Sequence, residues 1–184
     1  MMSNAILDPS GTYRYWLFRS WDKSLPHVCF CMLNPSTADA TCDDPTIRRC
    51  IGFAKAWGCG SLSVVNLFAY RATSPKELKL VPDPIGLYNY HFIQQTSHHA
   101  SMTVAAWGVH GNQLHQGQIV LPMLKNPVCL GLTSAGHPKH PLYVLQDTPL
   151  MSYTAVAFAK QGVGSDAVQQ QLCQSTCIAD NGST

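Results

Sequence analysis

A polar turn closes an apolar run near residue 33, and its residue types suit the handling of a ligand or of a water molecule. Leu33 ends the run, and Asn34-Pro35-Ser36-Thr37 follows it. If the run is a buried strand of an open α/β sheet, these groups lie at its carboxyl end, where such folds bind ligands. The amide of Asn34 offers a donor and an acceptor, so it can orient a water or bind a substrate amide. The alternative is that the segment only forms a turn and a helix cap.

Three later segments end in the same way. Asn66 ends an apolar run, Trp107-Gly108 ends another, and Gly136-His137-Pro138 follows a third. The carboxyl ends of parallel strands share one edge of a sheet. We therefore expect a single mouth that holds Asn34, Asn66, Trp107 and His137. Trp107, and also Tyr70, could stack on a base there, although buried aromatic residues more often belong to the core.

Charged residues follow the first turn. Asp43 or Asp44 suits the N-cap of a helix, whereas Asp39 is free to act as a general base or to hold a metal. Arg48 and Arg49 lie early in that helix, and they are either solvated surface charges or ligand-binding groups. If one of them faces the mouth, its guanidinium could bind a phosphate together with the N–H groups of the helix N-terminus.

Strand and helix patterns alternate along the chain, which favours a parallel sheet with helices on both faces. We predict a three-layer α/β/α sandwich with a four- to five-stranded, mainly parallel sheet in one domain, residues 1–149. Residues 150–184 read as a polar C-terminal extension, partly mobile. The predicted strands cover residues 11–20 (an edge strand), 28–33, 61–67, 102–107 and 128–132; helices are expected within 43–58, 73–78, 87–99 and 110–125.

The composition sets limits on function. The chain has 184 residues, 46% of them hydrophobic and 12% charged, and a formal net charge of +2. That charge neither argues for nucleic acid nor excludes it. We expect no membrane span, no signal peptide and a cytoplasmic location. The cysteines read as free thiols, including Cys173 and Cys177 in the extension, so no metal site and no cofactor is predicted.

Several ordered stretches carry a resemblance to a known family. They read MLNPSTADATCDDPTIRRC, VVNLFAYRAT, DPIG, AAWG and GLTSAGHPKHPLY. Residues from about 11 to 145 resemble the uncharacterised bacterial and phage family catalogued as domain of unknown function 1643. That resemblance implies no activity by itself.

The order of the motifs is also distantly similar to the uracil-DNA glycosylase superfamily. Leu33-Asn34-Pro35 resembles the motif that positions water, which implies that role for Asn34. Val64-Val65-Asn66 resembles the segment that reads the base edge, and Ala106-Trp107-Gly108 resembles the third strand. Gly136-His137-Pro138 resembles the histidine loop, which implies that His137 faces the leaving base. Because the loop continues His140-Pro141-Leu142, His140 could align instead, and Leu142 could be the wedge residue.

The resemblance predicts a uracil-DNA-glycosylase-like fold and a nucleobase-directed N-glycosidic hydrolase acting on a flipped or modified base. An enzyme on free nucleotides or modified-base precursors, with Asp39 or Asp44 as base or magnesium ligand, is the first alternative, and the weak net charge favours it over duplex binding. A non-catalytic module that binds nucleic acid or a nucleotide is the second. The predicted residues are Asn34, His137 and Asp39 for catalysis; Pro35, Ser36, Thr37, Asn66, Tyr70, Trp107 and His140 for the substrate; and Arg48, Arg49, Arg71 and Lys139 for phosphates.

Overall fold

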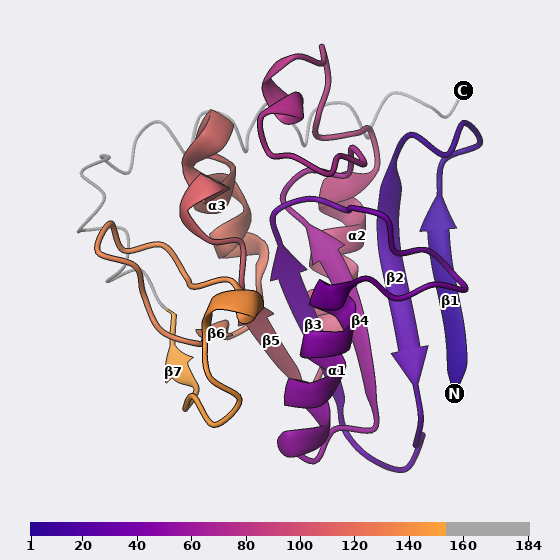
Figure 1. Ribbon diagram of the computed structural model, residues 1–184, viewed down its shortest axis with the longest axis vertical. Coiled ribbons are helices and arrows are strands. Elements are labelled where there is room, and N and C mark those ends of the chain that lie inside the picture. Colours follow the sequence, from indigo (N-terminus) through magenta and orange to yellow (C-terminus); the bar gives the residue numbers. More distant parts are fainter. Residues whose placement is uncertain (154–184) are drawn as a thin grey trace, which may run out of the picture.

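The computed structural model describes residues 1–153, which form one mixed sheet with helices on both faces (Figure 1). The strands are β1 (Met2–Leu7), β2 (Arg14–Ser20), β3 (His27–Met32), β4 (Ser61–Asn66), β5 (Met102–Ala105), β6 (Val128–Cys129) and β7 (Met151–Ser152). The helices are α1 (Pro45–Ala56), α2 (Asn89–His99) and α3 (Gln116–Val120), with short 3-10 turns η1 (Glu77–Lys79), η2 (Val109–His115), η3 (Leu121–Met123) and η4 (Pro141–Tyr143).

The sheet has seven strands in the order β1-β2-β4-β3-β5-β6-β7. Its four central strands, β4, β3, β5 and β6, run parallel, and β1, β2 and β7 are antiparallel to their neighbours. The predicted α/β class is confirmed. The predicted sheet of four or five mainly parallel strands was wrong, because antiparallel strands extend it at both ends.

The strand over residues 11–20 is not an edge strand as predicted. β1 pairs along the whole of β2, from Met2 opposite Ser20 to Leu7 opposite Arg14. β1 itself is mostly exposed, so it lacks the apolar alternation that would have marked it as a strand in the sequence. Pairing with β2, rather than burial of its side chains, holds it in the sheet.

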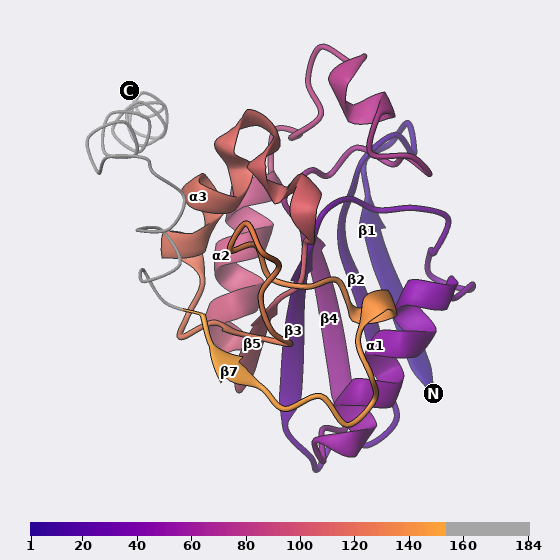
Figure 2. The same cartoon turned by 60° about the vertical axis from the view of Figure 1, so that its left-hand side comes forward.

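Helix α1 covers one face of the sheet, and α2 and α3 lie on the other (Figures 1 and 2). The Asp44 side chain accepts a hydrogen bond from the Ile47 N–H and Pro45 fills the first turn, which fixes the start of α1. Ile47, Cys50 and Phe53 recur at helical spacing and pack against the sheet.

The connections reverse direction in the middle of the sheet. The chain passes from β3 through α1 to β4 on one side, and then from β4 through α2 to β5 on the other side of β3. Across the sheet the parallel strands are therefore ordered β4-β3-β5-β6, so that β3, the first of them in the chain, lies between the second and the third. In such sheets the crevice beyond the carboxyl ends, next to the first strand, is the usual ligand site.

The last described residues belong to the sheet. Met151 and Ser152 pair with β6, and Tyr153 is buried with its ring edge-on to Trp107 at 5.7 Å. These residues fall within the segment predicted as an extension; residues 154–184 of that segment, Cys173 and Cys177 included, lie outside the described residues. Within residues 1–153, no helix has both the length and the apolar character needed to cross a membrane.

Candidate functional site

A cavity of about 620 Å³ opens at the carboxyl edge of the parallel strands. It collects the ends of β3, β4 and β5, the start of α1 and the loop before η4. Its apolar wall includes Met32, Leu33, Val64 and Trp107. Its polar lining comprises Arg14, Asn34, Ser36, Asp44, Thr46, Asn66, Thr73, His110, Thr133, Lys139, His140 and Tyr143. Three of the four expected strand-end side chains, Asn34, Asn66 and Trp107, therefore meet in one mouth.

The side chain of Asn66 is buried in this cavity wall, and its Nδ2 has no hydrogen-bond partner among the described residues. The residue is 1% exposed. The backbone nearby is satisfied differently: Asn89 donates from Nδ2 to the carbonyls of Asn66 and Leu67, at 3.0 Å each. Because a buried amide is normally paired, the Asn66 amide is suited to a partner that enters the cavity.

Asn34 is held in one orientation. Its Nδ2 donates to the carbonyls of Ala72 (2.7 Å) and Pro35 (2.9 Å). These two bonds use both amide hydrogens, and the Oδ1 accepts no hydrogen bond from the described residues. Asn34 lines the cavity, and its Oδ1 is able to accept a hydrogen bond from a water molecule.

Of the two histidines in the His-Pro loop, His140 lines the cavity and His137 does not; His110, from η2, also lines it. The backbone of His137 is tied to Thr133, since its N–H donates to the Thr133 Oγ1 and its carbonyl accepts from the Thr133 N–H. The chain continues from this tight turn to His140-Pro141, and His140 lines the cavity. The prediction that His137 lies at the mouth was therefore wrong, and its alternative is the residue found there.

His140 is set up as a neutral hydrogen-bond donor. Its Nδ1 accepts from the Leu142 N–H at 3.3 Å, so in the neutral ring the hydrogen is on Nε2. Burial lowers the pKa of His140 to about 4, with Asp44 acting weakly in the opposite direction. A neutral imidazole can donate to a developing anion without losing a proton to it.

A pH–rate profile tests this protonation state. The folded pKa of His140 lies below the ordinary value, so the ring stays neutral from high pH down to roughly pH 5 and gains a proton only near pH 4. We expect kcat/KM to show no loss attributable to an ordinary histidine between about pH 8 and pH 5.5. A fall with a midpoint near 6.5 that the His140→Asn variant lacks would contradict this assignment.

The carboxylate at the mouth is Asp44, whereas Asp39 does not line it. The Asp39 Oδ1 accepts from the backbone N–H groups of Thr41 (2.8 Å) and Cys42 (2.9 Å), and these bonds lower its pKa to about 2. Such a carboxylate is a weak base. The catalytic role of Asp39 stays a prediction, and the geometry does not support it, because its side chain closes a local turn outside the cavity lining. Asp44 lines the cavity while its Oδ1 caps α1.

Two of the predicted phosphate-binding arginines are engaged with backbone carbonyls outside the cavity. Arg48 donates to the Asp43 carbonyl at 2.5 Å, and Arg71 donates to the Gly11 carbonyl at 3.1 Å. Of the four predicted cations only Lys139 lines the cavity.

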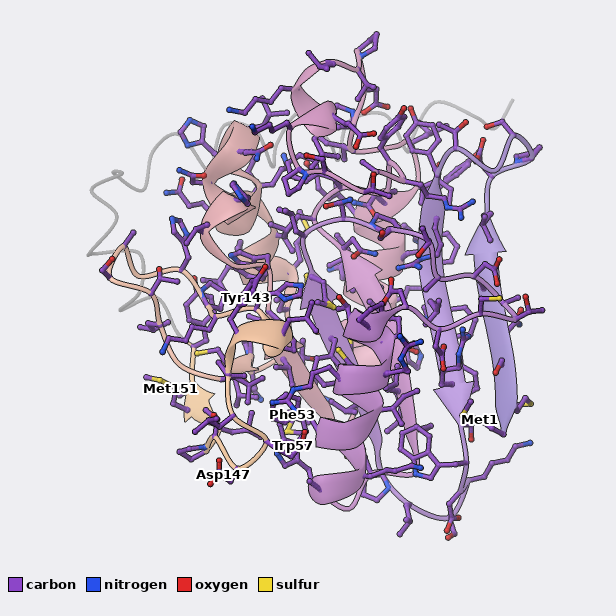
Figure 3. The ribbon with its side chains drawn as sticks, viewed as in Figure 1. Met1, Phe53, Trp57, Tyr143, Asp147 and Met151 are labelled. Carbon is purple, nitrogen blue, oxygen red and sulfur yellow. The ribbon has the colours of Figure 1, made fainter. Side chains whose placement is uncertain are left out.

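The third, Arg49, fixes the loop that follows His140. It donates to the carbonyls of Val144 (2.5 Å) and Pro141 (3.3 Å), and its guanidinium lies 4.9 Å from the centre of the Phe53 ring. Figure 3 shows Phe53 on α1 and Tyr143 on η4 above it in that view. Arg49 therefore holds the loop that carries His140 in place. It does not line the cavity, in contrast to the predicted role in phosphate binding.

The remaining predicted substrate residues divide in two. Ser36 and Trp107 line the cavity, whereas Pro35, Thr37 and Tyr70 do not. Tyr70 packs edge-on against Tyr13, with ring centres 6.0 Å apart, and so belongs to the packing between β2 and the loop after β4.

Trp107 is 2% exposed, and its indole Nε1 has no partner. A Cβ added at Gly111 would lie 1.9 Å from the Trp107 Cδ1. The absence of a side chain at Gly111 is therefore what allows this ring to pack beneath the cavity.

Arg14, which the sequence patterns did not single out, lines the cavity and is 2% exposed. Its Nη1 donates to the Ala38 carbonyl at 2.6 Å, and its Nε has no partner. Burial lowers its pKa to about 10, so the guanidinium stays charged at neutral pH. An arginine at the start of an aromatic-rich strand gave no signal that it would turn inward.

Metal ligands and reactive thiols are not apparent near the cavity. Among residues 1–153 no group of three histidine, cysteine, aspartate or glutamate residues could hold a metal ion. Cys29 and Cys31 are buried, and burial raises the pKa of the Cys29 thiol to about 12. The polar side chains at this edge are the amides of Asn34 and Asn66, the imidazoles of His110 and His140, the carboxylate of Asp44, the cations of Arg14 and Lys139, and several hydroxyl groups.

Comparison with known proteins gives a family. The family described as "Protein of unknown function (DUF1643)" matches residues 14–142, a range that holds β2 to η4 and nearly all of the cavity lining. No curated protein and no solved structure matches the chain. The matched range covers most of the sequence, and the chain belongs to this family of unknown function.

Proposed function

We propose that the cavity binds a nucleobase and hydrolyses its N-glycosidic bond. The observation that carries the proposal is the buried, unpartnered Nδ2 of Asn66 in the cavity wall. A base edge with adjacent carbonyl and N–H groups complements an amide that both donates and accepts. A site built in this way discriminates strongly against ligands that leave its polar groups unpaired.

The other groups supply the chemistry of the step. The C1′–N bond breaks and its electron pair leaves with the base. The Nε2–H of His140 donates a hydrogen bond to the base as negative charge develops on it. A water held by the Asn34 Oδ1 bonds through its oxygen to C1′, and Asp44 takes the proton that this water loses. Trp107 forms an apolar wall of the cavity that holds the base.

Substituting Asn34 tests the proposal. Purified protein is incubated with free nucleotides and with single- and double-stranded oligonucleotides that carry uracil, hydroxymethyluracil, hypoxanthine or a mismatch. Released base and abasic sites are then measured. We expect release by the wild type on at least one substrate and about 100-fold slower release by Asn34→Ala, because its water loses its acceptor.

The matched control is Thr37→Ala, in the same turn but outside the cavity lining; it is expected to keep the wild-type rate. Equal rates for the wild type and Asn34→Ala would contradict the role of Asn34. If no base is released from any substrate while nucleotides still raise the melting temperature of the protein, the protein is a nucleotide-binding module and not a hydrolase.

A further inference from the structure

Arg14 reaches the cavity because β2 carries a bulge. Ile6 pairs with Trp16, but the next residue, Leu7, pairs with Arg14, so Tyr15 is an extra residue in β2. Tyr15 stacks on Phe92 of α2 at 5.4 Å. Bulges of this kind re-aim side chains and are common beside active sites.

The bulge changes the face on which Arg14 lies. Regular alternation would place Arg14 with Trp16 and Phe18, which lie with Phe92 on the α2 face. Instead its guanidinium bonds to the carbonyl of Ala38, a residue packed in the core beneath α1. The extra residue therefore brings a charged side chain to the α1 face at the carboxyl edge of the sheet.

The buried guanidinium forms no ion pair within residues 1–153, although the negative charge of Asp44 acts on it. Within the described residues the single ion pair joins Arg19 to Asp43, at 2.8 Å. Arg14 donates one hydrogen bond, from Nη1, and its buried Nε has no acceptor among the described residues. A buried charge is normally paired, and a guanidinium suits the two-point binding of a phosphate or carboxylate.

Neighbouring groups favour an anion at the same place. Thr46 and Ile47, in the first turn of the twelve-residue helix α1, line the cavity, and a helix N-terminus stabilises negative charge. Lys139 adds a second cation at the rim. Asp44 opposes them with one negative charge, which leaves the three charged groups with a net positive charge.

We propose that Arg14 is the phosphate subsite of this cavity and that the substrate is a free nucleoside monophosphate. The assignment rests on the proposed function, which supplies the base. Arg14 is 2% exposed, so only a group that enters the cavity can approach it. A terminal phosphate can do so, whereas a phosphodiester would also have to place the nucleotides on both of its sides within the cavity. Arg48, Arg49 and Arg71, which a strand would need at the surface, bond to backbone carbonyls. The volume of about 620 Å³ suits one small ligand.

Calorimetric titration of the whole protein tests the subsite. The probes are deoxynucleosides, their 5′-monophosphates, inorganic phosphate and a single-stranded oligonucleotide. For the wild type we expect the monophosphate to bind about 10- to 100-fold more tightly than its nucleoside. Arg14→Gln should lose that difference and keep the nucleoside affinity. Arg48→Gln, which removes an exposed arginine that donates to one backbone carbonyl outside the cavity, should keep the difference.

The outcomes separate the two proposals. Equal affinities of the wild type for nucleoside and monophosphate, with base preference intact, overturn the subsite and leave the proposed function standing. A phosphate gain with no preference among bases supports the subsite and overturns the proposed function. An oligonucleotide that binds more tightly than any monophosphate and is insensitive to Arg14→Gln overturns the subsite in favour of nucleic acid. If Arg14→Gln does not fold, the affinities of the wild-type protein for nucleoside and monophosphate still test whether the cavity has a phosphate subsite.

Discussion

An Asn66→Ala variant is expected to lose about 100-fold in kcat/KM for base release and to unfold at nearly the wild-type temperature. The loss follows from removing two hydrogen bonds to the base, each worth about 1–1.5 kcal/mol. Stability is retained because the Asn66 Nδ2 makes no hydrogen bond within the described residues. Removal of a buried unpaired amide relieves a desolvation penalty that offsets the lost packing. We expect a change in the free energy of unfolding within about 1 kcal/mol.

Asn89→Ala is the matched control, since it removes the neighbouring buried asparagine. Its Nδ2 donates to two backbone carbonyls, so this variant should lose about 2–3 kcal/mol of stability. Denaturant unfolding and steady-state kinetics on both variants make the comparison. A marked loss of stability in Asn66→Ala with unchanged turnover would show that Asn66 is structural.

A His140→Asn variant is expected to lower kcat by about 100- to 1000-fold while substrate binding is largely kept. The change removes the donor to the leaving base, and the loss of one such donor has an effect of this size. Asparagine keeps an acceptor for the Leu142 N–H, so the start of η4 is preserved. Single-turnover kinetics separate the chemical step from binding.

The partner variant is His137→Asn, which changes the other histidine of the loop. His137 does not line the cavity, so folded His137→Asn should release base at the wild-type rate. A large loss of kcat in His137→Asn, with His140→Asn active, would restore the assignment suggested by the motif order.

The position of the cavity at the carboxyl edge of the sheet could be predicted from the sequence, because buried parallel strands consist almost entirely of apolar residues. Each central strand is a continuous apolar run, so the first polar residue after it marks the carboxyl end. That reasoning places Asn34 and Asn66 correctly, and Trp107 with them. It needs no knowledge of how the strands are ordered, since parallel strands end at one edge.

The remaining features depend on pairings that the local sequence does not encode. Arg14 faces the cavity through a bulge that is defined only against β1. The choice between His137 and His140 depends on the turn closed by Thr133. Arg49 bonds to the Val144 carbonyl, far along the chain, so its helix position alone could not exclude a role in phosphate binding.

The most direct test of the account is a crystal structure of the Asn34→Ala variant with 2′-deoxyuridine 5′-monophosphate. Slower hydrolysis in this variant would keep the nucleotide intact in the cavity. We expect a base edge within hydrogen-bond distance of the Asn66 amide, with Trp107 beside it. A nucleotide bound elsewhere, or a base that leaves the Asn66 amide unpaired, would contradict it.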